Sequence, residues 1–232
     1  MNLPGNNPRL LEDIEKATLR LVFQALADYR RQTLEIFKME NDAPMDIAED
    51  ITREALDGMG VAKMPVRLFG KVDYKRAQYV FLPGHSIKQA LFVDSKAERA
   101  EGRGTATLQM SQISMRVRQR RQNRQIDIPG LLPVSVERGG ESFLTTTVFV
   151  KYNYREEGNQ RTLEDITAAC LPNGRLQEQY NPNADDTIWL AGRNAPSLGE
   201  EFRVRLNFKK LMEKARWRVQ TVPARGAPVW AD

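Results

Sequence analysis

Residues 89–96, QALFVDSK, constrain the fold more than any other segment of this 232-residue chain. The apolar residues are continuous rather than alternating, which is typical of a strand that is buried on both faces. Residues two positions apart in a strand point to the same face, so Asp94 and Lys96 should emerge side by side where the strand ends. The segment therefore predicts a central strand that carries a carboxylate and an amine into one site.

The rest of the chain predicts helices around such a sheet. Apolar residues recur at helical spacing within 10–40, and a second helix is expected over 45–57. We expect strands over 66–74, 89–96, 145–154, 161–171 and 202–208, and helices over 105–118 and 211–215. The turn signal at 82–84, Leu-Pro-Gly, would join the first two strands. This order of elements predicts an α/β or α+β domain with a mixed sheet.

The composition is that of a globular protein of one domain. Hydrophobic residues make up 41% and charged residues 28%, and the length favours a single domain. The one cysteine, Cys170, cannot form an internal disulfide, and we see neither a signal peptide nor a membrane-spanning run. We therefore expect a cytoplasmic protein that does not bind membranes. A net charge of +5 is compatible with a polyanionic partner but does not identify one.

A second acid, Asp73, lies near the end of the preceding expected strand. A hairpin would bring it beside Asp94, and two carboxylates suit a Mg²⁺ ion that keeps positions for water and phosphate. Lys96 could hold or deprotonate a metal-bound water and stabilise a pentavalent phosphorus transition state. Chance predicts roughly 1.4 acidic-x-Lys matches in this composition, and the chain holds two, at 73–75 and 94–96. A surface ion pair at a strand end therefore remains the alternative.

Residues 202–208, FRVRLNF, alternate between apolar and polar side chains. Arg203, Arg205 and Asn207 share the polar face. Arginine can bond both major-groove acceptors of guanine, and asparagine pairs with adenine, so the strand could read adjacent bases. A half-buried edge strand with a solvated basic face fits the same pattern.

A second basic cluster comprises Arg116, Arg118, Arg120, Arg121 and Arg124. It could clamp phosphates, which fixes the register on DNA without reading sequence. A solvated, partly flexible helix end is the alternative. The lone His85 has no second histidine at a spacing that a metal site or a catalytic triad needs.

Six segments together resemble, in the same order, the SfiI-like type II restriction endonucleases of the PD-(D/E)xK nuclease superfamily. They are AEDIT (48–52), VDYKR (72–76), LFVDSKA (91–97), TLQMSQ (107–112), RLQEQYNP (175–182) and RVRLNF (203–208). The resemblance implies an α/β core with a mixed β-sheet flanked by helices. It further implies Mg²⁺-dependent hydrolysis of double-stranded DNA at a specific palindromic, G/C-containing site. Cutting both strands of such a site implies a homodimer or homotetramer.

The resemblance also assigns catalytic and metal-binding residues. Asp73 and Asp94 correspond to the metal-binding carboxylates, Lys96 to the catalytic lysine, and the backbone carbonyl of Ser95 would complete the metal shell. The matching helix offers a further acid, Glu49 or Asp50, which could support the metal through a water.

For DNA binding, Arg203 and Arg205 correspond to a guanine-reading pair, and Arg103 to another arginine near the DNA. Asn207 stands where the relatives carry an aromatic residue, and the cluster at 116–124 has no counterpart. These departures leave the target sequence open.

On this interpretation one domain, 1–232, contains N-terminal helices (10–57), a catalytic core (66–118) and DNA-reading and C-terminal strands (140–220). A structure-selective repair or junction nuclease of the same fold is one alternative. A non-catalytic DNA-binding protein that keeps the scaffold is another, and an unrelated structural or interaction protein is a third.

Overall fold

The computed structural model describes residues 7–40, 43–60, 62–63, 77–81, 87–102, 104–121, 124–158, 160–190 and 203–232, with the backbone alone for 62–63, 77–81 and 138. The α-helices are α1 (Pro8–Asp28), α2 (Arg30–Met39), α3 (Pro44–Asp57), α4 (Gln177–Tyr180) and α5 (Phe208–Lys214). The strands are β1 (Ala62–Lys63), β2 (Ala77–Phe81), β3 (Gln89–Arg99), β4 (Thr105–Gln109), β5 (Val117–Arg121), β6 (Arg124–Ile128), β7 (Ser135–Arg138), β8 (Glu141–Glu157), β9 (Gln160–Leu171), β10 (Trp189–Leu190), β11 (Arg203–Asn207) and β12 (Val219–Pro223). Within these residues, no helix combines the length and the apolar character that a membrane span requires.

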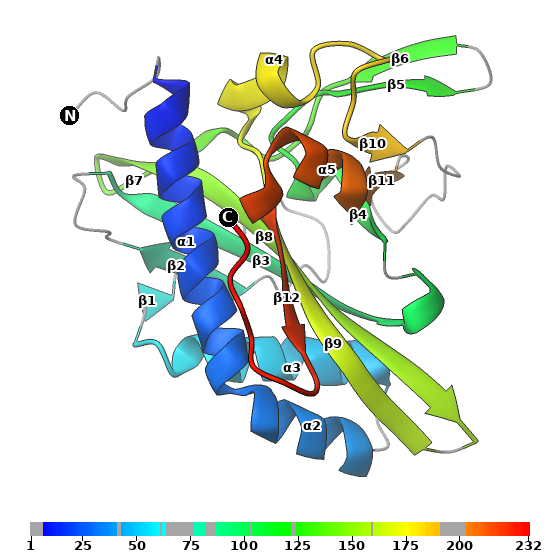
Figure 1. Ribbon diagram of the computed structural model, residues 1–232. Coiled ribbons are helices and arrows are strands. Elements are labelled where there is room, and N and C mark those ends of the chain that lie inside the picture. The colour runs from blue at the N-terminus through cyan, green and yellow to red at the C-terminus, as the bar shows by residue number, and fades with distance from the viewer. Residues whose placement is uncertain are drawn as a thin grey trace.

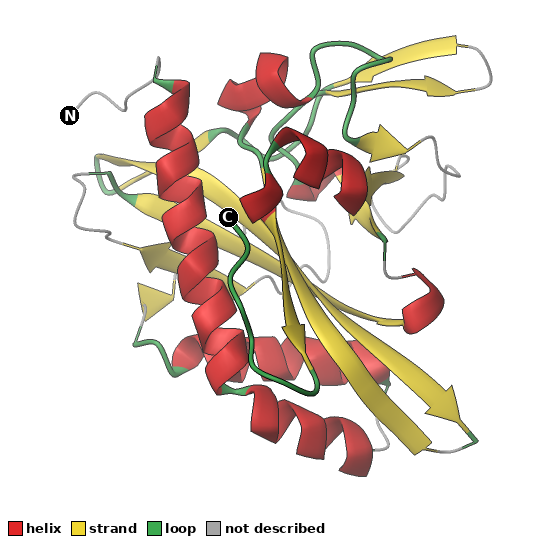
Figure 2. Cartoon of the chain, viewed as in Figure 1, coloured by secondary structure: helices red, strands yellow, loops and turns green. Residues whose placement is uncertain are grey.

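The expected N-terminal helices are confirmed as α1, α2 and α3. Asn7 caps α1, its side chain accepting a hydrogen bond from the backbone of Leu10, and Pro8 occupies the first helical position. The three helices cover one face of the main sheet (Figures 1 and 2). The core that they share with the sheet includes Leu26, Ile51 and Val150.

The main sheet is mixed, as expected. Its order is β1-β2-β3-β8-β9-β12, with β7 paired to the start of β8. β3 runs parallel to β8 and antiparallel to β2. The turn predicted at 82–84 lies outside the described residues. β7 and β8 meet at Gly139 and Gly140, whose φ angles of 57° and 76° suit a two-residue hairpin turn. β8 is covered on both faces, since its residues 143–154 are all buried.

A second sheet, β10-β11-β4, packs on the other face of the main sheet together with α4 and α5. Leu108 of β4 and Leu206 of β11 are fully buried against Phe149 and Ala169 of the main sheet. β5 and β6 form a separate two-stranded hairpin beside this second sheet (Figure 1).

The helix expected over 105–118 is wrong. β4, a turn of 3₁₀ helix (Met110–Gln112) and β5 occupy these residues. Ala106 and Leu108 are buried while their neighbours are partly exposed, which is the two-residue period of a strand. β11 supplies the pairing partner, about one hundred residues away in sequence, with Val204 opposite Leu108.

A buried ion pair joins the two ends of the described chain. Arg218, just before β12, donates to Glu15 of α1 at 2.7 Å, and neither side chain is exposed to solvent. Glu15 also accepts from the backbone of Asn173 at 2.8 Å, and the guanidinium lies 4.3 Å from the ring centre of Tyr180. This pair connects the first helix, the end of β9 and the last strand.

Candidate active site and DNA-reading strand

Asp94 and Lys96 emerge together from β3, on the sheet face opposite the three N-terminal helices. Five buried residues precede them in the strand, and their side chains are 20% and 23% exposed. The Lys96 ammonium lies 3.9 Å from the Asp94 carboxylate and donates to the Thr107 carbonyl of β4 at 2.5 Å. It also lies 5.6 Å from the ring centre of Phe149. The structure therefore brings a carboxylate and an amine together in a partly buried site.

Ser95 points to the opposite face and fixes β3 on α3. Its hydroxyl donates to Thr52 at 2.8 Å, and Thr52 shares a hydrogen bond of 2.8 Å with Tyr152 of β8. Burial raises the pKa of Tyr152, so this hydroxyl remains neutral. The side chain of Ser95 thus has a structural role, which leaves its backbone carbonyl as the group that could bind a metal.

A second carboxylate, Glu49 of α3, is electrostatically coupled to Asp94. Burial raises the pKa of Glu49 above its ordinary value, and the negative charge of Asp94 raises it further. Asp50, by contrast, forms an ion pair with Arg53. Of the two acids that the sequence offered on this helix, Glu49 is the one whose pKa responds to the charge of Asp94, and a divalent cation would relieve the repulsion between them.

Two predicted site residues, Asp73 and Arg103, lie outside the described part of the chain, as do His85 and the expected strand 66–74. Ala77, four positions after Asp73, pairs with Val93, directly before Asp94. Among the described residues, no three acidic, histidine or cysteine side chains gather closely enough to hold a metal ion. Asp94 and the Ser95 carbonyl offer oxygen donors of the kind that Mg²⁺ prefers, and a site for this ion would need a further acid beside them.

β11 presents the predicted alternation. Val204 and Leu206 are fully buried, whereas Arg205 is exposed and Arg203 and Asn207 are half-buried. The edge-strand alternative is wrong, because β11 pairs with β10 on one side and β4 on the other. Arg205 donates to the hydroxyl of Thr105 at 3.1 Å.

Asn207 has a role that the sequence interpretation missed. Its side-chain oxygen accepts from the backbone of Lys210 at 3.2 Å and caps α5. The signal was present, since asparagine is a preferred residue at the start of a helix. This bond engages the oxygen that a bidentate contact to adenine would use.

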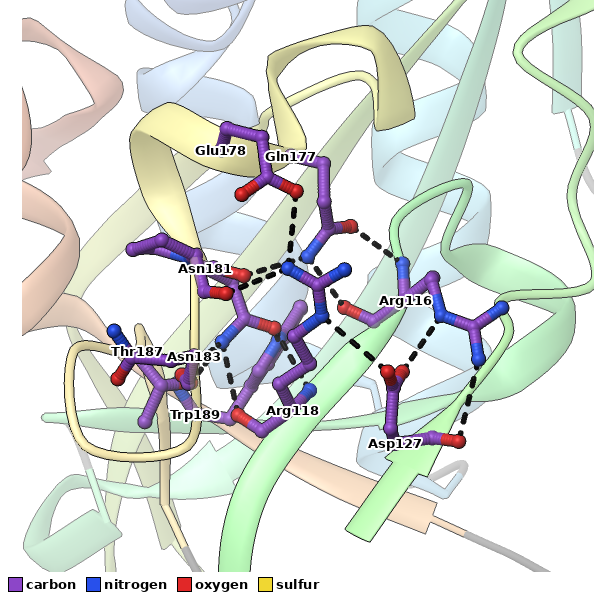
Figure 3. Close-up of polar contacts among 10 residues, drawn as sticks. Arg116, Arg118, Asp127, Gln177, Glu178, Asn181, Asn183, Thr187 and Trp189 are labelled. Carbon is purple, nitrogen blue, oxygen red and sulfur yellow. Dashed lines mark hydrogen bonds and ion pairs between the residues drawn. The ribbon is translucent and has the colours of Figure 1, made fainter.

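The arginine cluster forms the β5–β6 hairpin, so the helix-end alternative is wrong. Arg116 and Arg118 both pair with Asp127 across the hairpin, at 2.6 Å and 3.4 Å. Arg118 reaches Glu178 of α4 at 3.0 Å, as Figure 3 shows. Arg120 pairs with an acid in the loop before β10, Asp185, at 2.5 Å. At least these three arginines therefore bind carboxylates of the protein itself.

Asn181 anchors the hairpin on this loop. It is fully buried, accepts from the Arg118 backbone at 2.8 Å and the Trp189 indole at 3.0 Å, and donates to the Arg118 carbonyl at 2.9 Å. A further bond of 2.7 Å reaches Thr187 (Figure 3). One side chain thus fixes both the hairpin and the strand that flanks β11.

Asn181→Ala should lower the free energy of unfolding by about 3 kcal/mol, because it leaves several buried polar groups without partners. Urea denaturation would measure the loss. Asn183→Ala, at an exposed position in the same loop, is the matched control and should cost clearly less. Equal losses for the two variants would contradict this role of Asn181.

A family model and a known relative both match most of this chain. Residues 27–222 match the family model described as "Type II restriction enzyme SfiI". The chain is 35% identical over 225 residues to the type II restriction enzyme SfiI of Streptomyces fimbriatus, covering 90% of this chain and 83% of that protein.

Two solved structures are similar as well. Tetrameric SfiI bound to cognate DNA superposes with a TM-score of 0.80 at 30% identity, over 94% of this chain and 86% of that chain. BglI bound to its DNA recognition sequence gives 0.70 at 17% identity, over 96% and 94% of the two chains, which shows the shared fold. The chain belongs to the family of the type II restriction enzyme SfiI.

Proposed function

We propose that this chain is a Mg²⁺-dependent type II restriction endonuclease that hydrolyses double-stranded DNA at a specific palindromic, G/C-containing site. The observation that carries the proposal is the pairing of Asp94 with Lys96 directly after the buried first half of β3, in a chain of the SfiI family. We take 1–232 as a single restriction-endonuclease-like domain that acts in the cytoplasm, in keeping with its lone buried cysteine, Cys170.

The metal would be held by Asp94, the Ser95 carbonyl and Asp73. Ala77, four positions after Asp73 in the sequence, pairs with Val93 directly before Asp94. Bound Mg²⁺ supplies an acidified water ligand and charge neutralisation at the phosphate. Glu49 would orient a water from the α3 side.

Lys96 would assist the attack of water on phosphorus. Its ammonium, held by Asp94 and the Thr107 carbonyl, would position the attacking water and stabilise the negative charge of the pentavalent transition state. The water oxygen bonds to phosphorus as the bond to the 3′ oxygen breaks, which releases a 3′-hydroxyl and leaves the 5′-phosphate.

Arg203 and Arg205 would read guanines in the major groove from β11, and Arg103 would contact the DNA nearby. Asn207 completes the polar face, although its capping bond favours the two arginines as the principal readers. Two active sites related by a twofold axis are needed to cut both strands, so we propose a homodimer or homotetramer. The solved SfiI relative is a tetramer on its cognate DNA.

The end sequences of fragments cut from a known plasmid in the presence of Mg²⁺ test this function. A restriction enzyme gives fragments with one recurring sequence at their ends, whereas a structure-selective nuclease leaves a linear duplex without fixed cuts. Absence of any cleavage, with binding intact, would support a non-catalytic DNA-binding protein instead.

Arg203→Ala and Arg205→Ala should each weaken binding to the cognate site by about 1–3 kcal/mol, since each removes a bidentate base contact. Fluorescence anisotropy without Mg²⁺ would measure the affinity. Arg225→Ala removes the same charge from an exposed position near the N-terminal helices and should change affinity little. Unchanged affinity and site choice in both β11 variants would refute their reading role.

A further inference from the structure

Lys151 of β8 is a buried lysine that the proposed reaction does not use. It lies opposite Lys96 in the parallel pairing of β3 with β8, and its side chain has no exposed surface. An unpaired buried ammonium would be costly, so its partners indicate what holds it there.

Three acceptors surround the Lys151 ammonium and match its three N–H groups. They are the Glu98 carboxylate at 2.6 Å, the Gly102 carbonyl at 2.5 Å and the Thr105 carbonyl at 2.8 Å. Glu98 follows Lys96 on the same face of β3, and Thr105 begins β4. Lys151 therefore holds both ends of the connection between the catalytic strand and β4.

Gly102 lies close to the ion pair between Lys151 and Glu98. A Cβ atom at Gly102 would lie 3.2 Å from the Glu98 carboxylate and 3.6 Å from the Lys151 nitrogen. The backbone thus lies close to the ion pair, and a side chain at position 102 would require the Glu98 carboxylate to move slightly.

β4 also contacts both parts of the candidate site. Its Thr107 carbonyl accepts from Lys96, and its Thr105 hydroxyl accepts from Arg205. Thr107 is the Cα partner of Arg205 in the pairing of β4 with β11. A displacement of β4 would therefore move the catalytic lysine and the reading arginine together.

We propose that Lys151 is a positioning residue for DNA cleavage, which holds β4 against the catalytic strand so that Lys96 and Arg205 keep a fixed relation. The inference rests on the proposed function. A buried ion pair is a weak source of stability compared with apolar packing. Burial lowers the pKa of Lys151 and the charge of Arg205 lowers it further, while Glu98 opposes the shift. The chain thus keeps a charged lysine at position 151, where an apolar residue would be easier to bury. The hydrogen bonds by which Lys151 positions β4 explain why a charged residue is kept there.

Single-turnover cleavage of cognate DNA at saturating enzyme tests the proposal. Lys151→Met should slow cleavage by about 100-fold, the loss expected from a shift of about 1 Å in a catalytic group, and should weaken the affinity for cognate DNA less than Arg205→Ala does. Glu98→Gln, which keeps an acceptor but removes the charge, should give a smaller loss of the same kind. Lys88→Met, remote and paired with Glu141, is the control and should cleave normally.

A folded Lys151→Met protein that cleaves at the wild-type rate would overturn the proposal, as would one in which only Kd changes. Should Lys151→Met fail to fold, a wild-type cleavage rate in Glu98→Gln would overturn it. Asp94→Ala, assayed in parallel, distinguishes failure of the proposed function from failure of the proposed role of Lys151. If that variant cleaves normally the proposed function fails, whereas an inactive Asp94→Ala beside a fully active Lys151→Met removes only the role of Lys151.

Discussion

Asp94→Asn should slow plasmid cleavage by about 1000-fold or more, the largest effect that we expect from any substitution. Asparagine keeps the shape of the side chain but removes the charge that binds the metal. The transition state then loses several kcal/mol of stabilisation, and each 1.36 kcal/mol lowers the rate about tenfold. Cleavage of a plasmid that carries the recognition sequence, followed over time in Mg²⁺, would measure the rate.

Binding should respond in the opposite direction. Removing a negative charge beside the scissile phosphate leaves the affinity for cognate DNA unchanged or increases it. Asp13→Asn, an equivalent change at an exposed position of α1, should leave both cleavage and binding as they are. A fully active Asp94→Asn enzyme would exclude Asp94 from the reaction.

Glu15→Ala should destabilise the fold by about 3–5 kcal/mol, because it leaves the Arg218 guanidinium buried without its principal partner. For a chain of this size the melting temperature should fall by about 10 °C. Calorimetry and urea denaturation would measure both quantities.

The exposed pair between Lys16 and Asp232 provides a matched control, because it also joins α1 to the C-terminal residues. Asp232→Asn should hardly change stability, since exposed ion pairs are weak. Combining Glu15→Met with Arg218→Met removes both charges and should recover much of the loss. If Glu15→Ala lowered the free energy of unfolding no more than Asp232→Asn does, the buried pair would not stabilise the fold.

Local patterns predicted the elements whose sequence period matches their burial. The amphipathic N-terminal helices and the long apolar strand β3 were confirmed, as were the strands expected over 145–154 and 161–171. β12 was missed because VQTVP is short and ends in proline. The segment that became β4 was misread because its partner, β11, lies far along the chain, and a short stretch such as TATLQ suits either element until that partner is known.

The candidate site likewise combines features that local sequence predicts with features that depend on distant packing. The proximity of Asp94 to Lys96 follows from the two-residue period of one strand, so sequence alone predicted it. Lys151 and the choice of Glu49 over Asp50 depend on how separate elements pack, and no spacing along the chain encodes that.

The internal ion pairs of the β5–β6 hairpin change how the basic character of this protein should be interpreted. Salt weakens DNA binding in proportion to the phosphates that free cationic groups neutralise, through release of condensed counterions. Arg116, Arg118 and Arg120 already have carboxylate counterions within the protein. They would contribute little to that release, so the ionic-strength dependence of DNA affinity should be shallower than a simple count of arginines suggests.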